Sequence, residues 1–254
     1  MVANNIEYVI TMRELTKRII KWMMTTAFLA YPRKIILEPI IAQCVLARKA
    51  MIIFYSDPKR TQALELIRKI KSENKMVLGD NEAYQILMAV ERTEKIDGDI
   101  AEVGVFRGSS AKLICEAKSH KILHLFDTFE GLPDSHEEDN PKQFKKGGFS
   151  APLEDVKNYL KKYHNVYFYK GFFPFTAEPV KNKKFSFVNL DVDLCQSTKD
   201  CLEFFYPRMN RGGVIISHDY ISVPGVQKAI DDFFKNKPEP VIELSGSQCL
   251  IVKL

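Results

Sequence analysis

Ile100-Ala-Glu-Val-Gly-Val-Phe-Arg-Gly-Ser-Ser110 begins with a short apolar run that contains one acidic residue. Two glycines follow, and a helical pattern starts at Ser110. This order predicts a strand, a tight turn and a helix, because glycine adopts backbone conformations that other residues avoid. The start of a helix behind such a turn offers unpaired N–H groups to a ligand. Gly104-x-x-x-Gly108 differs from the Gly-x-Gly-x-x-Gly of dinucleotide-binding folds, and no Gly-Lys-Ser/Thr of a phosphate-binding loop follows.

Beyond this stretch, short apolar runs alternate with amphipathic segments, which is typical of a parallel sheet with crossover helices. The candidate strands are Ile100–Val105, Ile122–Phe126, Val166–Tyr169, Phe185–Leu190, Val214–Ile216, Val241–Glu243 and Cys249–Val252. The candidate helices are Ser110–Lys118, Leu153–Tyr163, Thr176–Lys181, Ser197–Tyr206 and Gly225–Phe234. We therefore predict an α/β fold with a mostly parallel seven-stranded sheet, helices on both faces and a final antiparallel hairpin.

The charge is unevenly distributed along the 254 residues. Residues 1–77 hold 14 Lys/Arg against 6 Asp/Glu, whereas the remainder holds 23 against 26. We expect a basic, apolar helical segment at residues 1–75, followed by the α/β domain at residues 76–254. The longest uncharged stretch of the N-terminal segment, Trp22–Pro32, is too short to span a bilayer. The segment either packs as a helical layer on the core or on a second subunit, or lies on a membrane surface or an acidic partner.

Five cysteines are odd in number and show no Cys-x-x-Cys spacing. This usage indicates free thiols in a reducing compartment rather than a disulfide framework or a zinc site. The N-terminal residues lack the pattern of a signal peptide. We therefore expect a cytoplasmic protein.

The polar segment Asp127–Pro152 is long for a connection between a strand and a helix. Segments of this length in compact domains are often lids over a binding site. Its first residue, Asp127, lies 25 residues beyond Glu102, at the end of the second predicted strand. An acid at that position accepts hydrogen bonds from ribose hydroxyls in nucleotide-binding α/β folds; the alternative is a solvated aspartate that opens a loop.

Acidic residues and a histidine follow the fourth and fifth predicted strands. Asp191 and Asp193 share one face after the fourth strand, and His218-Asp219 follows the fifth. Oxygen-rich clusters of this kind bind Mg²⁺, and a histidine ligand widens the choice to Mn²⁺, Fe²⁺ or Co²⁺. The alternative is helix capping by Asp193 or Ser197, which accounts for only one of these residues.

Four motifs together resemble the macrocin O-methyltransferase family, over about Met76–Leu254. They are Ala101–Gly108, Phe126–Pro133, Leu190–Leu194 and Gly212–Tyr220. The resemblance implies a class I, Rossmann-like methyltransferase fold. It also implies a metal-assisted enzyme that uses S-adenosylmethionine (SAM) to methylate a hydroxyl of a sugar or another polyhydroxylated small molecule. It further implies a homodimer, for which the apolar N-terminal helices are a candidate interface.

The resemblance also implies residue roles. Glu102, Gly104 and Gly108 line the SAM pocket and Asp127 holds the ribose; the metal ligands are Asp191, His218 and Asp219; and Asp193 is the general base. We add Arg107, Ser109 and Thr128 to the predicted cofactor-binding set. For Arg107, a contact with the SAM carboxylate and a surface ion pair are equally open. His218 departs from the family's usual aspartate, which leaves the choice between Mg²⁺ and Mn²⁺ open. Cys195 stands where the family often has tyrosine.

Two other functions remain open. The first is a methyltransferase for catechol-like phenols, which the aromatic-rich Phe172–Phe175 loop favours. The second is a non-catalytic SAM-binding protein whose basic N-terminus docks on nucleic acid or anionic lipid. A pure binder has no use for clustered carboxylates beside a cofactor pocket, so we expect a glycosylated small-molecule acceptor and no nucleic-acid partner.

Overall fold

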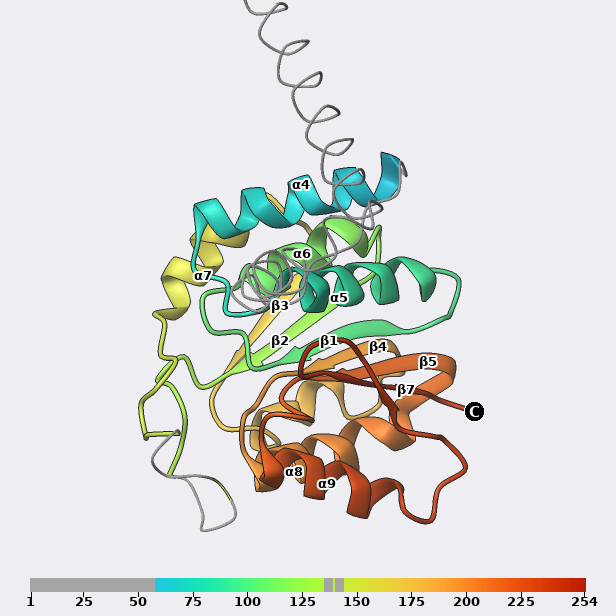
Figure 1. Ribbon diagram of the computed structural model, residues 1–254. Coiled ribbons are helices and arrows are strands. Elements are labelled where there is room, and N and C mark those ends of the chain that lie inside the picture. The colour runs from blue at the N-terminus through green and yellow to red at the C-terminus, as the bar shows by residue number, and fades with distance from the viewer. Residues whose placement is uncertain (1–57, 135–138, 140–143) are drawn as a thin grey trace, which may run out of the picture. The chain divides into compact units, whose positions relative to one another are not determined.

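The computed structural model describes residues 58–134, 139 and 144–254. Seven strands form one sheet in the order β3-β2-β1-β4-β5-β7-β6 (Figure 1). Their bounds are β1 (Asp99–Val103), β2 (Leu123–Asp127), β3 (Val166–Lys170), β4 (Phe185–Leu190), β5 (Met209–Ser217), β6 (Ile242–Glu243) and β7 (Cys249–Val252).

The sheet has the predicted mixture of directions. Strands β1 to β5 pair in parallel, whereas β7 pairs antiparallel with both β5 and β6. Strand β1 lies between β2 and β4, so the chain order reverses beside it. Open α/β sheets bind ligands at such a reversal, outside the carboxyl ends of the strands.

Helices cover both faces of the sheet, as predicted (Figure 1). One face carries α4 (Pro58–Glu73), α5 (Asp80–Arg92), α6 (Ser109–Ala117) and α7 (Leu153–Leu160). The other carries α8 (Cys195–Phe205), α9 (Pro224–Phe234) and the 3-10 helices η3 (Phe175–Val180) and η4 (Tyr206–Arg208).

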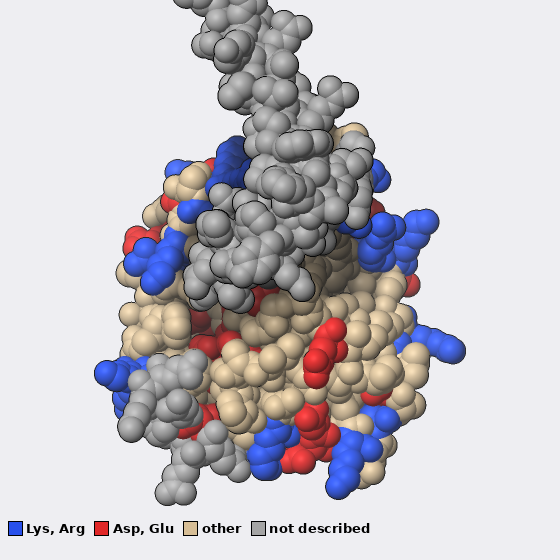
Figure 2. Space-filling view, in the orientation of Figure 1, with Lys and Arg blue, Asp and Glu red and all other residues tan. Residues whose placement is uncertain are grey.

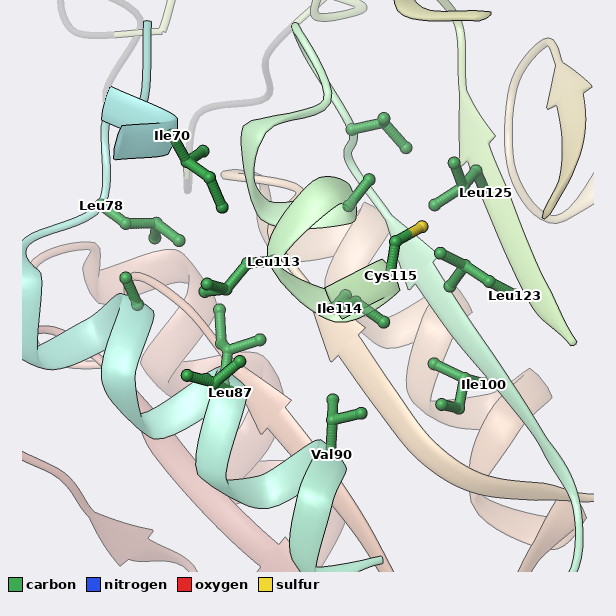
Figure 3. Packing of buried hydrophobic residues seen from close by; sticks show 14 of the residues in the cluster. Ile70, Leu78, Leu87, Val90, Ile100, Leu113, Ile114, Cys115, Leu123 and Leu125 are labelled. Carbon is green, nitrogen blue, oxygen red and sulfur yellow. The ribbon is translucent and has the colours of Figure 1, made fainter. Parts of the chain in front are cut away.

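The first core is aliphatic (Figure 3). Leu87 and Val90 of α5 and Ile114 of α6 pack over Ile100 of β1 and Leu123 of β2, and all are almost fully buried. Helical spacing puts the apolar residues of each helix on one side, and strand alternation puts those of each strand on one face. Each such buried side chain stabilises the fold by about 1.5–3 kcal/mol.

The second core is aromatic and reaches the end of β2. The ring of Phe126 stacks on Tyr169, with centroids 4.6 Å apart, and meets Phe173 edge to face at 5.3 Å. Phe173 in turn stacks on Phe205 of α8 at 5.4 Å. These contacts hold the backbone just before Asp127 in place.

The structure departs from the elements predicted above in several places, and the helix predicted at Thr176–Lys181 is the 3-10 helix η3. Strand β5 begins at Met209 rather than Val214, because residues 210–213 form a bulge opposite Phe185–Phe187 of β4. Helix α5 was not predicted. Helix α4 falls in the predicted N-terminal segment, yet its Ile67 and Ile70 are completely buried in the aliphatic core. The boundary at residue 75 stays a prediction, since residues 1–57 lie outside the described residues.

The described surface is mixed in charge. Figure 2 shows Lys and Arg in separate groups on one face, with acidic side chains among them. In the described ranges no helix is long and apolar enough to cross a bilayer. None of the four cysteines in these ranges forms a disulfide. The cationic segment that motivated a membrane or acidic partner lies mostly outside the described residues.

Candidate active site

The turn from β1 to α6 packs directly against the end of β4. Gly104 has φ +87°, and a Cβ there would lie 1.8 Å from the carbonyl oxygen of Asp191. Only glycine tolerates both the left-handed conformation and this close approach. Gly104 therefore brings the glycine turn and the end of β4 together.

Asp127 ties β2 to the same turn. Its Oδ2 accepts the backbone N–H groups of Val105 at 2.7 Å and Phe106 at 2.9 Å, and its Oδ1 accepts that of Phe129 at 2.6 Å. A carboxylate has about four acceptor positions, so three are used and about one is left for a ligand hydroxyl. Asp127 therefore organises the turn as well as facing the cavity.

A cavity of about 280 Å³ lies where these strand ends meet. Its lining includes every predicted site residue except Glu102 and Gly108, namely Gly104, Arg107, Ser109, Asp127, Thr128, Asp191, Asp193, His218 and Asp219. The structure thus brings the predicted cofactor residues and the predicted metal residues into one cavity.

Glu102 and Gly108 lie behind the cavity wall. Glu102 is completely buried and accepts a hydrogen bond from Asn189 Nδ2 at 2.9 Å. Burial raises its pKa to about 8, against the opposing hydrogen bonds from Asn189 and Ser110, so the carboxyl is mostly neutral at neutral pH. Gly108 precedes α6 in the left-handed conformation, with φ +80°.

The predicted metal ligands meet at the ends of β4 and β5. Asp191 Oδ1 and Asp219 Oδ2 lie 3.2 and 2.9 Å from Nδ1 of His218. One ligand atom from each residue lies within 4.8 Å of the others. Two carboxylate oxygens and one imidazole nitrogen make a donor set that fits a divalent cation.

The electrostatics of this cluster favour positive charge. Burial alone would lower the pKa of His218, but Asp191, Asp219 and Glu82 raise it well above its usual range. Burial, followed by the nearby carboxylates of Asp191 and Asp219, raises the pKa of Asp193 to about 9. Asp193 therefore has a much higher proton affinity than an ordinary aspartate.

Capping of α8 does not explain Asp193 or Ser197. The residue before this helix is Leu194, and no side chain at that position caps it. The first N–H of α8, from Cys195, is donated instead to Oδ1 of the buried Asp139 at 2.7 Å. The capping alternative is therefore wrong for both residues.

Two backbone hydrogen bonds join the two ends of the predicted lid within the described residues. Leu132 N–H is donated to Gly148 O, and Gly147 N–H to Leu132 O, each at 2.9 Å. The rest of the lid, residues 135–138 and 140–143, lies outside the described residues.

In the aromatic loop Phe172–Phe175, Phe173 is buried in the aromatic core. Phe172 lines the cavity, and Phe175 is 83% exposed.

Two residues beside His218 were not predicted, Glu82 of α5 and Ser247 of the hairpin between β6 and β7. Ser247 Oγ lies 3.1 Å from His218 Nε2, and Glu82 Oε1 lies 3.5 Å from the same nitrogen. Gly79 and Glu82 carry a helix-start pattern, which identifies a cap and not a site residue. No local signal marks Ser247.

Part of this chain is similar in sequence to two O-methyltransferases. A tetracenomycin methyltransferase of Streptomyces olivaceus, 8-demethyl-8-(2,3-dimethoxy-alpha-L-rhamnosyl)-tetracenomycin-C 4'-O-methyltransferase, is 30% identical over 169 residues, which are 60% of this chain and 64% of that protein. Demethyldecarbamoylnovobiocin O-methyltransferase of Streptomyces niveus is 27% identical over 153 residues, 54% of this chain and 58% of that protein. The matched regions thus span less than two thirds of either relative's length.

The fold is shared as well. The solved structure of the O-methyltransferase NovP superposes with a TM-score of 0.62 at 23% identity, covering 70% of this chain and 81% of that one. This likeness shows the class I methyltransferase fold. The family model for macrocin O-methyltransferases matches residues 57–246, which include the glycine turn, Asp127 and the acidic cluster. The chain belongs to the macrocin O-methyltransferase family.

Proposed function

We propose that this protein is a SAM-dependent, divalent-metal-assisted O-methyltransferase that methylates a hydroxyl of a sugar or another polyhydroxylated small molecule. The observation that carries the proposal is the single cavity lined by both Asp127 and the Asp191–His218–Asp219 cluster. The Streptomyces olivaceus relative is named for 4'-O-methylation of a rhamnosyl compound, which supports a glycosylated acceptor.

The glycine turn would hold the cofactor, and SAM would supply a methyl group on a positively charged sulfur. Asp127 would accept a hydrogen bond from a ribose hydroxyl with its remaining acceptor position, and the guanidinium of Arg107 would pair with the carboxylate of the methionine part. Ser109 and Thr128 complete the polar wall. Glu102 takes part indirectly, by supporting the turn from behind.

Asp191, His218 and Asp219 would hold the cation, Mg²⁺ or Mn²⁺, which makes a neighbouring hydroxyl more acidic. Asp193 lies beside them and, in its ionised form, would accept the hydroxyl proton. A bound cation would offset the repulsion from Asp191 and Asp219 that adds to the raised pKa of Asp193, and so would favour that ionised form. The same residues would orient the acceptor oxygen toward the methyl group.

The test is calorimetry on EDTA-treated protein, first with SAM and then with Mg²⁺ or Mn²⁺. We expect micromolar SAM binding, and separate metal binding that Asp191→Ala and Asp219→Ala each remove while SAM affinity stays within about threefold. Turnover of glycosylated acceptors should then require the metal. Absence of SAM binding under all conditions would contradict the methyltransferase function.

A catechol-type acceptor is the second candidate, because Phe172 lines the cavity and Phe175 is exposed nearby. A sugar hydroxyl and a catechol assayed side by side separate the two. The cytoplasmic location and the homodimer remain predictions.

A further inference from the structure

His218 is contacted on both of its ring nitrogens. Nδ1 faces the carboxylates of Asp191 and Asp219 in the cavity. Nε2 faces away from them, toward Ser247 Oγ at 3.1 Å and Glu82 Oε1 at 3.5 Å. The two nitrogens therefore have different partners, and those partners decide which nitrogen carries the hydrogen in the neutral ring.

The hydroxyl of Ser247 determines which ring nitrogen of His218 carries the hydrogen. Glu82 Oε1 accepts the Ser247 backbone N–H at 2.8 Å and the Ser247 hydroxyl at 3.0 Å. Since the hydroxyl proton goes to Glu82, Ser247 Oγ can only accept from Nε2–H. A ring that ligates a cation would then keep its hydrogen on Nε2 and direct the lone pair of Nδ1 to a cation between Asp191 and Asp219.

We propose that Glu82 and Ser247 are positioning residues that make Nδ1 of His218 a metal ligand. This inference rests on the proposed metal site. Histidine brings no negative charge where the family resemblance leads us to expect an aspartate. Glu82 places a carboxylate behind the ring, and such an outer partner fixes the ring and strengthens its donor nitrogen.

Helix capping by Glu82 uses its other oxygen. Oε2 accepts the N–H of Gly79 at 2.6 Å at the start of α5, while Oε1 serves Ser247. Ser247 takes no part in that cap. A substitution at Ser247 therefore removes the contact with His218 Nε2 and leaves the start of α5 intact. Glu82→Gln keeps one acceptor oxygen for the Gly79 N–H of the capping box, but its amide nitrogen cannot accept the Ser247 N–H.

The experiment titrates Mn²⁺ into the full-length protein by calorimetry, for wild type, Ser247→Ala, Glu82→Gln and the control Glu91→Gln. Glu91 lies exposed on the same helix. We expect Ser247→Ala and Glu82→Gln to weaken Mn²⁺ binding 10- to 100-fold, with SAM affinity close to wild type and, for Ser247→Ala, a melting temperature close to wild type. Glu91→Gln should bind Mn²⁺ as wild type does.

The same substitutions are then made in a His218→Asp background, where no ring needs orienting. There we expect Ser247→Ala and Glu82→Gln to change the Mn²⁺ affinity less than about threefold. Equal weakening in both backgrounds, or unchanged affinity in the His218 background, would overturn the positioning role. Absence of Mn²⁺ binding by wild type would overturn the metal site itself, and the wild-type titration alone reveals that case.

Discussion

At the scale of single residues, Asp193 and Glu102 are two carboxyls whose pKa is raised above the ordinary value, and they differ in whether they face the cavity. Asp193 faces the cavity beside Asp191 and Asp219, so charge repulsion adds to the effect of burial. Glu102 lies under the glycine turn, where burial is the main cause of its raised pKa. The first group can exchange a proton with a ligand, whereas the second supports structure.

Asp193→Asn tests the general base. The amide has nearly the same shape but cannot accept the hydroxyl proton, so we expect turnover to fall about 10²- to 10⁴-fold. Affinity for SAM and for the metal should stay close to wild type, as calorimetry will show. A fully active Asp193→Asn enzyme would remove Asp193 from the role of base.

Glu102→Gln tests whether the buried carboxyl of Glu102 carries a proton in the folded state. The folded state holds that proton up to about pH 8, whereas an unfolded glutamate loses it near pH 4.5, so wild-type stability falls between these two values as the pH rises. Glutamine removes this dependence, and at pH 8 the variant should be more stable by on the order of 3 kcal/mol. Urea unfolding at several pH values measures the difference, with Glu91→Gln as control. If the free energy of unfolding changed with pH in the same way for Glu102→Gln and wild type, Glu102 would be ionised in the folded state.

At the scale of elements, the site is built where loops meet strand ends. The β1–α6 turn, the end of β2 and the end of β4 are held together by Asp127 and by the close contact at Gly104. The end of β5 joins them because its ladder with β4 runs from Phe187 to Leu190 and places His218 beside Asp191. The site geometry therefore depends on these turns remaining in register.

Gly104→Ala compared with Gly147→Ala tests this dependence. Both glycines have a left-handed φ, but a Cβ at Gly147 would meet nothing within 4 Å. Gly147→Ala should cost about 1–2 kcal/mol of stability, from backbone strain alone. Gly104→Ala also forces the turn away from Asp191, so it should cost at least about 3 kcal/mol and abolish SAM binding. Equal costs in urea unfolding would contradict the close packing at Gly104.

At the scale of the whole molecule, the described residues form two cores on opposite faces of one sheet. The aliphatic core joins α4–α7 to the strands, and the aromatic core joins α8, α9 and η3 to them. The sheet lies between them, so neither core is complete without it. We expect both faces to unfold in one transition.

Ile114→Val and Ile230→Val probe the two faces separately. Both isoleucines are completely buried, the first in the aliphatic core and the second in the aromatic core. Each substitution should cost about 1 kcal/mol. Because the two isoleucines lie in different cores, the double variant should cost about 2 kcal/mol, with a single transition in urea. Separate transitions would show that the faces unfold independently.

The strand and helix patterns of the sequence determined the sheet, its antiparallel end and the group of residues at its carboxyl edge. Alternation within a few residues is enough to predict a strand, and strand ends in a parallel sheet share one edge, so Asp191, Asp193 and His218-Asp219 could be placed together. Their contacts confirm that placement.

Only the tertiary structure decided what surrounds these residues. Glu82 and Ser247 are 165 positions apart, and they meet because α5 and the β6–β7 hairpin pack at the same end of the sheet. Glu102 belongs to the best-marked motif, yet its burial behind the turn depends on Asn189 of β4 and on the packing of α6. Local patterns encode elements, whereas burial and long-range partners arise only when those elements pack.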